Sequence, residues 1–319
     1  MRLALALSLV AAPAFADVDA ALDRHILPGH LKLAETTATL AAAAEEDCTP
    51  EPLKAPFNTA YDAWLGVSHI QFGPIEDQGL SLAMAFWPDP KDRTGKALRD
   101  LASATDPIVD DPDSFGEVSV AAQGFTALER LLYESQTDPD YACQLAVAIA
   151  RDLARKSTLL EEGWEDHATL LRDAGANARY QSDLEAQRAL FTALSTGLEF
   201  LHDQRLGRPL GTFDRPRPAR AEARRSGRTL RHIKLSLAAL EDLTTTMAAD
   251  TPQTQAAFAE ARARAAALND PTLAGVADPA SRFKIEVLQQ AVRAVQLAVI
   301  EEIGNPLGIQ AGFNALDGD

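Results

Sequence analysis

The sequence has few of the residues that build β-sheets and little of their spacing. Aromatic residues make up 6% of its 319 positions, and strand-like alternation of valine, isoleucine, threonine and aromatics is nearly absent. Alanine, leucine, glutamate, arginine and glutamine dominate instead, and apolar residues recur at the spacing of amphipathic helices. The sequence therefore predicts an all-α fold.

Long apolar runs are also missing. After residues 1–16, no segment reaches the roughly 18 uninterrupted apolar residues that a membrane-spanning helix needs, so we expect no membrane span. Residues 1–16 run from Arg2 through a short apolar stretch to Ala14-Phe15-Ala16, the small-x-small pattern that signal peptidase recognises. We expect a cleaved signal peptide, a mature chain from Asp17 and a periplasmic location. A buried N-terminal helix is the alternative.

Cysteine is scarce, which limits covalent and metal chemistry. Cys48 and Cys143 are the only two cysteines, and two thiolates alone make a poor zinc site. In an oxidising compartment an isolated pair more often forms a disulfide. Such a bridge would tie the end of the first predicted helix to a helix after Tyr141, whereas two separate buried thiols are the alternative.

Positive charge is in deficit, with a formal net charge of −16 and an isoelectric point near 4.8. Binding to nucleic acid depends on clustered lysine and arginine that release counterions, so we expect no nucleic-acid partner. One basic cluster departs from the overall acidity, at residues 215–220 with Arg224, Arg225, Arg228 and Arg231. This cluster either holds an anion or a carboxylate, or forms a solvated linker and helix face.

The helical periodicity falls into two groups of segments that meet near Gly175. The first group is expected over residues 18–46, 53–69, from about 92, 118–134 and 141–173, with an irregular stretch rich in glycine and proline at 72–90. The second group is expected over residues 177–205, 219–249, 252–267 and 279–303. Pro28-Gly29 should disturb the first helix. Two tandem helical bundles, 17–176 and 177–319, are the simplest architecture.

Motifs of the common hydrolases are absent from the sequence. A zinc metalloprotease helix needs two histidines four residues apart beside a glutamate, and the six histidines are scattered without this spacing. Only 199–202 matches one of the two Glu-x-x-His pairs of a di-iron bundle. No nucleophile elbow or phosphate-binding glycine loop is present. The residues themselves therefore give no support for an enzyme.

Several short motifs occur in an order that resembles the imelysin-like family of bacterial envelope proteins. The strongest are Trp64-Leu-Gly-Val-Ser-His-Ile-Gln-Phe-Gly-Pro-Ile-Glu76, Phe86-Trp-Pro-Asp-Pro-Lys91, Gly124-Phe-Thr-Ala-Leu-Glu-Arg-Leu-Leu-Tyr133 and the terminal Gly312-Phe-Asn-Ala-Leu-Asp-Gly-Asp319. Residues 205–211 and 225–230 match as well. The resemblance implies a pair of helical bundles with a site in the cleft between them, and a link to iron uptake or iron-regulated expression.

The hallmark of that family, Gly-x-His-x-x-Glu, falls here on residues 124–129, where Thr126 stands in place of the histidine. A threonine hydroxyl is a weak ligand for transition metals, so the better half of the implied metal pair is missing. Glu129 either faces the cleft or pairs with an arginine of another helix. His69 either replaces the missing imidazole or is a structural histidine.

The candidate site combines residues of the 124–129 motif and of the irregular stretch with two arginines that would balance negative charge in the cleft. The expected ligand-binding residues are Gly124, Thr126, Glu129, His69, Trp87, Asp89, Arg225 and Arg282. The expected metal ligands are Glu129, His69 and Glu76, because carboxylate and imidazole groups suit iron and other hard or borderline cations. Solvated loop acids and an aromatic anchor at Trp87 are the structural alternatives.

Together these features predict a periplasmic binding or accessory protein in iron uptake, with its ligand between the two bundles. The expected partners are a metal ion or metal chelate and envelope components of iron uptake; iron is a possible cofactor, and none is required for folding. An envelope hydrolase of the metallopeptidase kind is an alternative, which would need three gathered protein ligands. A structural adaptor is another, and would present an exposed apolar patch.

Overall fold

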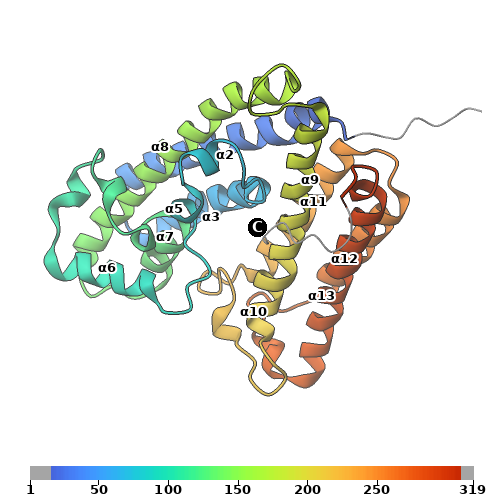
Figure 1. Cartoon of the computed structure of the whole chain (residues 1–319). Helices are drawn as coiled ribbons and strands as arrows, with labels where there is room; N and C mark the ends of the chain where they lie inside the picture. Colours follow the sequence, from blue (N-terminus) through green and yellow to red (C-terminus); the bar gives the residue numbers. More distant parts are fainter. Residues whose placement is uncertain (1–15, 310–319) are drawn as a thin grey trace, which may run out of the picture.

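The computed structural model of the protein describes residues 16–309, in which nearly all ordered segments are helical (Figure 1). Within this range the only β-pairing is two isolated bridges, Ala85 with Gly124 and Thr212 with Arg215. The all-α prediction is confirmed. The expected signal peptide and the terminal motif at 312–319 lie outside the described residues, apart from Ala16.

The first helices form one long N-terminal arm followed by an antiparallel partner. The arm comprises α1 (Val18–Ala21), a π-helical turn η1 (Leu22–Ile26) and α2 (Leu27–Glu46), and its partner is α3 (Pro50–Val67). Pro28 lies inside this continuous arm, directly after η1, where the N–H of Leu27 bonds to the carbonyl oxygen of Leu22. The irregularity expected at Pro28-Gly29 thus takes the form of the π-helical turn that precedes the proline. A Cβ on Gly29 would lie 2.5 Å from Cγ1 of Val67, so glycine permits the close approach of α2 and α3.

The rest of the first half consists of short elements that lead into the longest helix. They are α4 (Pro74–Asp77), α5 (Ser81–Met84), α6 (Arg93–Ala104), η2 (Pro107–Asp110), η3 (Phe115–Glu117), η4 (Val120–Ala122), α7 (Gly124–Tyr133) and α8 (Pro139–Arg172). The irregular stretch expected at 72–90 thus contains only two single-turn helices and a cis peptide bond at Trp87-Pro88. The carboxylate of Asp138 accepts the N–H of Tyr141 at 3.0 Å and caps α8.

The second half is built from four long helices and their connections. These are α9 (Asp183–Glu199), η5 (Phe200–Leu206), α10 (Gly207–Leu210), η6 (Pro218–Arg220), α11 (Thr229–Met247), α12 (Pro252–Ala267), η7 (Ala274–Ala277), α13 (Pro279–Val299) and η8 (Ile300–Gly304). The helix expected over 219–249 begins ten residues later, at Thr229. Positive φ angles at Ala223 (49°) and Gly227 (70°) turn the backbone before it and prevent a continuous helix.

Two separate clusters of buried apolar side chains hold the protein together. One is centred on α3, α7 and the first part of α8, and includes Phe57 and Phe125. The other is centred on α9, α11, α12 and α13. Leu22 of η1 and Trp164 of α8 belong to this second cluster, although both precede residue 176. Both α8 and the arm that contains α2 therefore cross from one cluster to the other, side by side in Figure 1. The division at 176/177 stays a prediction.

A disulfide joins Cys48, just after α2, to Cys143 in α8. Their Cα atoms are 5.0 Å apart, and 95 positions separate them in the sequence.

In the described part of the chain, no helix combines the length and apolar character needed to cross a bilayer.

Buried histidines make the stability of this fold depend on pH. Nδ1 of His30 lies 2.8 Å from the carbonyl oxygen of Ile26, and Nε2 of His167 lies 2.8 Å from the hydroxyl of Tyr180. Burial lowers the pKa of His30 to about 4. Burial, followed by the charge of Arg179, lowers the pKa of His167 to about 4. Between about pH 6.5 and these values the unfolded chain binds protons that the folded chain does not.

We expect the free energy of unfolding to fall as the pH decreases from about 6.5 to about 4, by up to about 3 kcal/mol for each of the two histidines. Urea unfolding at a series of pH values measures this slope. The His167→Gln variant should show a shallower slope, because it lacks one of the buried histidines whose pKa is lowered. Equal slopes for the variant and the wild type across this window would contradict the assignment.

Candidate functional site

Two adjoining pockets lie where the first half meets the second. The first, of about 460 Å³, is lined by α7, by the segment 87–94 and by the segment 219–225, and we call it the polar pocket. The second, of about 720 Å³, is lined by the end of α3, the segment 81–88 and α9, and we call it the aromatic pocket. Trp87, Pro88 and Glu222 line both. The expected cleft between the halves thus has two compartments.

Gly124 positions the motif helix α7 through its backbone. Its φ angle is +72°, and a Cβ at this position would collide with the carbonyl oxygens of Ala83 and Met84. An isolated β-bridge also pairs Gly124 with Ala85. Because only glycine tolerates both the positive φ and this close approach, it holds the start of α7 against the segment that carries Trp87. Gly124 does not line either pocket through a side chain.

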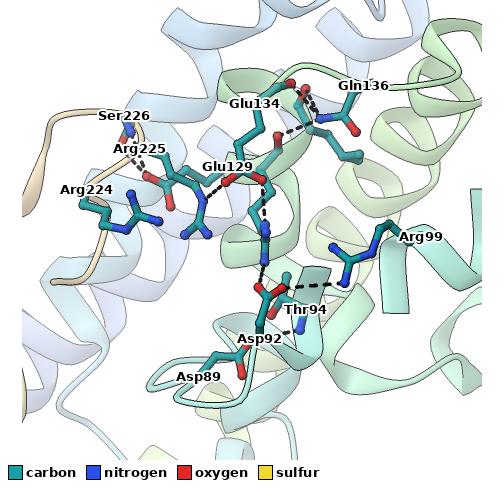
Figure 2. Close-up of polar contacts among 12 residues, drawn as sticks. Asp89, Asp92, Thr94, Arg99, Glu129, Glu134, Gln136, Arg224, Arg225 and Ser226 are labelled. Carbon is teal, nitrogen blue, oxygen red and sulfur yellow. Dashed lines mark hydrogen bonds and ion pairs between the residues drawn. The ribbon is translucent and has the colours of Figure 1, made fainter. Parts of the chain in front are cut away.

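Glu129 is 2% exposed and lines the polar pocket. The backbone N–H and the hydroxyl of Ser226 donate hydrogen bonds to its Oε1, at 2.9 Å and 2.7 Å (Figure 2). No arginine pairs with this carboxylate among the described residues. Glu129 thus lines the pocket with Ser226 from the second half as its partner, and its role in binding a ligand stays a prediction. Thr126, one turn earlier, lines the same pocket.

The other carboxylates of the polar pocket are bound by the protein's own groups. Figure 2 shows Asp92 and Glu134, which are joined through Arg130; Arg225 also pairs with Glu134. Burial alone raises the pKa of both carboxyl groups, but these arginines outweigh it and lower the pKa of each.

The remaining two acids are also satisfied. Asp89 accepts the N–H groups of Arg93 and Thr94 at 2.9 Å and 2.8 Å, and so caps the first turn of α6. Glu222 accepts a hydrogen bond from Nε of Arg205 at 2.8 Å. Every acid of this pocket therefore has a donor within the protein.

Three arginines of the polar pocket have no carboxylate partner among the described residues: Arg208, Arg220 and Arg224. Nε of Arg224 donates to the carbonyl oxygen of Ala219 at 3.1 Å, and Nε of Arg208 donates to Gln204. Burial, followed by the charge of Arg220, lowers the pKa of Arg208. The lining carries five arginines and five acidic side chains, so its formal charge is balanced, and the three guanidinium groups without a carboxylate partner are the groups that an anionic ligand could engage.

The structure does not bring the three expected metal ligands together. His69 and Glu76 line the aromatic pocket, whereas Glu129 lines the polar pocket. Glu76 lies 3.8 Å from Nη2 of Arg179. Across residues 16–309, no group of three or more histidine, cysteine, aspartate or glutamate side chains is arranged to hold a metal ion.

The remaining expected ligand-binding residues are divided. Trp87 lines both pockets, and its ring meets the ring of Phe200 edge-on with centroids 5.7 Å apart. Arg225 lines the polar pocket. Arg282 lines neither: Nη1 donates to the carbonyl oxygen of Leu210 at 2.7 Å, which fastens α13 to α10. Asp89 lines the polar pocket but serves as the cap described above.

Sequence reasoning missed Ser226 and Glu222, which complete the site. Ser226 is the partner of Glu129 from 97 positions away, and Glu222 is buried beneath both pockets. The basic cluster at 215–231 is recognisable in the sequence. It contributes Arg220, Arg224 and Arg225 to the polar pocket. Ser226 lies within the matching segment 225–230, but its contact with Glu129 arises from the turn at Ala223 and Gly227, which the local sequence does not predict.

Comparison with known proteins is consistent with this architecture. A relative from Synechococcus elongatus, iron-regulated protein A, is 25% identical over 226 residues, which cover 66% of this chain and 59% of that protein. The chain thus matches well under two thirds of the length of this relative. A solved imelysin-like protein from Psychrobacter arcticum has a TM-score of 0.76 at 19% identity, covering 95% of this chain and all of the other.

A solved protein from Parabacteroides distasonis has the same TM-score, 0.76, at 11% identity, covering 93% of this chain and 97% of the other. At these identities the likeness concerns the fold alone. The family profile described as Imelysin matches residues 26–299, which is most of the sequence. The resemblance seen in the motifs is confirmed, and the chain belongs to the imelysin family.

Proposed function

We propose that this protein is a periplasmic binding protein of iron acquisition that holds iron as an anionic chelate in the polar pocket. The observation that carries the proposal is the set of arginines without carboxylate partners, Arg208, Arg220 and Arg224. A chelate with free or metal-bound carboxylates offers planar oxygen pairs that match the guanidinium fork. Such a ligand brings its own donors to the metal.

Two features support iron as the cargo and the periplasm as the place. The relative from Synechococcus elongatus is named for iron regulation. The small-x-small pattern at residues 14–16 is typical of exported proteins, and a disulfide such as Cys48–Cys143 persists in an oxidising compartment. A zinc hydrolase would need three protein ligands around one position, and the described residues offer no such group.

Glu129 has a defined part in this proposal. Its Oε1 is engaged by Ser226, while no described group donates to its Oε2. Oε2 is therefore free to accept a hydrogen bond from a hydroxyl or a metal-bound water of the chelate. The arginines would supply affinity, and Glu129 would fix orientation between the two halves.

Calorimetric titration with ferric citrate, citrate alone and ferrous ion tests the proposal. We expect ferric citrate to bind and the bare ion to bind far more weakly. The Arg224→Gln variant should bind ferric citrate about tenfold more weakly, which is the loss of one charge-assisted contact. Arg264→Gln is the matched control, because Arg264 lies on α12 and pairs at the surface with Glu260.

Unchanged affinity for ferric citrate in Arg224→Gln would remove the arginines from the site. Tighter binding of ferrous ion than of ferric citrate would overturn the chelate proposal in favour of direct metal binding. Glu129→Gln distinguishes the two further, since it should weaken direct metal binding strongly and chelate binding only modestly.

A further inference from the structure

The aromatic pocket is chemically different from the polar pocket. Its volume, about 720 Å³, is that of a site for a small organic molecule. Aromatic rings from four segments line it: Trp64 of α3, Phe72 between α3 and α4, Trp87 of the segment 81–88, and Phe200 of η5. Its one arginine, Arg205, is already paired with Glu222 at 2.8 Å. Among the described residues, the aromatic pocket therefore has no arginine without a carboxylate partner, whereas the polar pocket has three.

A chain of three hydrogen-bonded side chains runs from the protein surface to this pocket. Oδ2 of Asp242 lies 2.6 Å from Nδ1 of His25, and Nε2 of His25 lies 3.0 Å from Nε2 of His69. The three come from α11, η1 and the segment after α3. The side chain of Asp242 is 57% exposed, whereas His25 and His69 are each only 6% exposed. His69 is the member that lines the pocket.

The order of donors and acceptors along these hydrogen bonds determines whether His69 offers a donor or an acceptor to the pocket. A carboxylate only accepts hydrogen bonds, so Nδ1 of His25 must donate to Asp242. In neutral His25 the other nitrogen, Nε2, then carries a lone pair and accepts the proton on Nε2 of His69. A neutral His69 with its proton on Nε2 has a lone pair on Nδ1. No described group donates to that nitrogen.

The surroundings keep His69 in its neutral form. Burial, followed by the positive charges that His25, His30 and Arg205 can carry, lowers the pKa of His69 well below its ordinary value. Nδ1 of His69 therefore carries an unused lone pair, on a residue that lines the aromatic pocket. Two carboxylates, Glu76 and Glu199, also line the pocket and disfavour an anionic guest.

From this arrangement we propose a second binding site, in the aromatic pocket, for a neutral aromatic compound whose hydroxyl or N–H group donates to Nδ1 of His69. The rings of Trp64, Trp87 and Phe200 would pack on the guest, and Asp242 and His25 would keep His69 in the accepting tautomer. Asp242 and His25 are positioning residues. The proposal concerns a different pocket from the iron-chelate site and stands without it.

Fluorescence titration with β-naphthol and its methyl ether tests this at neutral pH. The two compounds share the aromatic rings, and only the alcohol can donate. We expect the wild type to bind β-naphthol about five- to tenfold more tightly than the ether, which corresponds to one hydrogen bond to a buried acceptor. The His69→Phe variant should still bind the rings but lose this preference.

The Asp242→Ala variant separates tautomer control from packing, because Asp242 is largely exposed and its loss leaves the pocket walls in place. We expect it to bind the ether like the wild type and to prefer the alcohol by less than about twofold. Asp166→Ala, on an exposed acid of α8, is the control and should keep the full preference. Failure of the wild type to bind either compound, or an unchanged preference in Asp242→Ala, would overturn the proposal.

Discussion

Replacing both Cys48 and Cys143 with alanine is expected to lower the free energy of unfolding by about 4 to 5 kcal/mol, because the bridge closes a loop between residues 95 positions apart. An open loop of this length gives the unfolded chain much more conformational freedom, while the folded state loses only one contact between α2 and α8. Urea unfolding of the double variant beside the wild type measures the difference.

The wild type under reducing conditions is the natural control for this experiment. Its midpoint of unfolding should move to that of the double variant, since both lack the cross-link. Should the double variant unfold within about 1 kcal/mol of the oxidised wild type, the loop-closure argument would be wrong for this chain.

Removing the carboxylate of Glu222 is expected to destabilise the protein by about 3 to 5 kcal/mol, because it leaves a buried guanidinium without its counter-ion. Glu222 is 4% exposed, and Arg205, its partner at 2.8 Å, is 6% exposed. Nδ1 of His232 lies 3.3 Å from the same carboxylate oxygen. Burial alone raises the pKa of Glu222, but Arg205 and His232 outweigh it and hold the value at about 2.

Thermal and urea unfolding of Glu222→Ala provide the measurement. Glu260→Ala is the matched control: it breaks the exposed pair with Arg264 on α12 and should cost no more than about 0.5 kcal/mol. Similar costs in the two variants would show that the buried pair contributes no more than a surface pair. Glu222→Gln should lie between them, since the amide keeps one acceptor and loses the charge.

Much of the helical framework was predictable from local pattern. The helix expected over 141–173 occurs as α8, and the segment expected over 252–267 occurs as α12 with the same bounds. Pro139 and Pro252 mark these starts, because proline suits the first turn of a helix. Such signals depend only on neighbours in the sequence.

Helix boundaries that depend on a turn of the backbone were harder to predict from the sequence. The segment 219–228 has helix-forming composition, yet only its first two residues are helical, as the end of η6. The rest turns, since Ala223 takes a positive φ angle that its residue type does not predict. The helix expected over 118–134 begins at Gly124 for a similar reason: the backbone there meets residues 83–85 of another segment. Contacts made by tertiary structure decided both boundaries.

The sequence named only some of the residues that line the pockets, and it did not predict how they group. Glu129, Trp87, Asp89 and Arg225 do meet around one pocket. The sequence could not place His69 in the other compartment or pair it with His25, 44 positions away. Periodicity gives the face of a helix, and the packing of that face against distant segments follows only from the assembled fold.

The N-terminal arm (α1, η1 and α2) and α8, which both pack against the two apolar clusters, have a further consequence for how a guest enters. A hinge motion between the halves would have to bend the N-terminal arm and α8 at the same time. Each bend would break successive backbone hydrogen bonds of the helix. We therefore expect no large rigid-body closure of one half on the other. Residues 85–92 supply walls to both pockets, so we expect the residence time of a guest to respond to substitutions there more than to changes in α2 or α8.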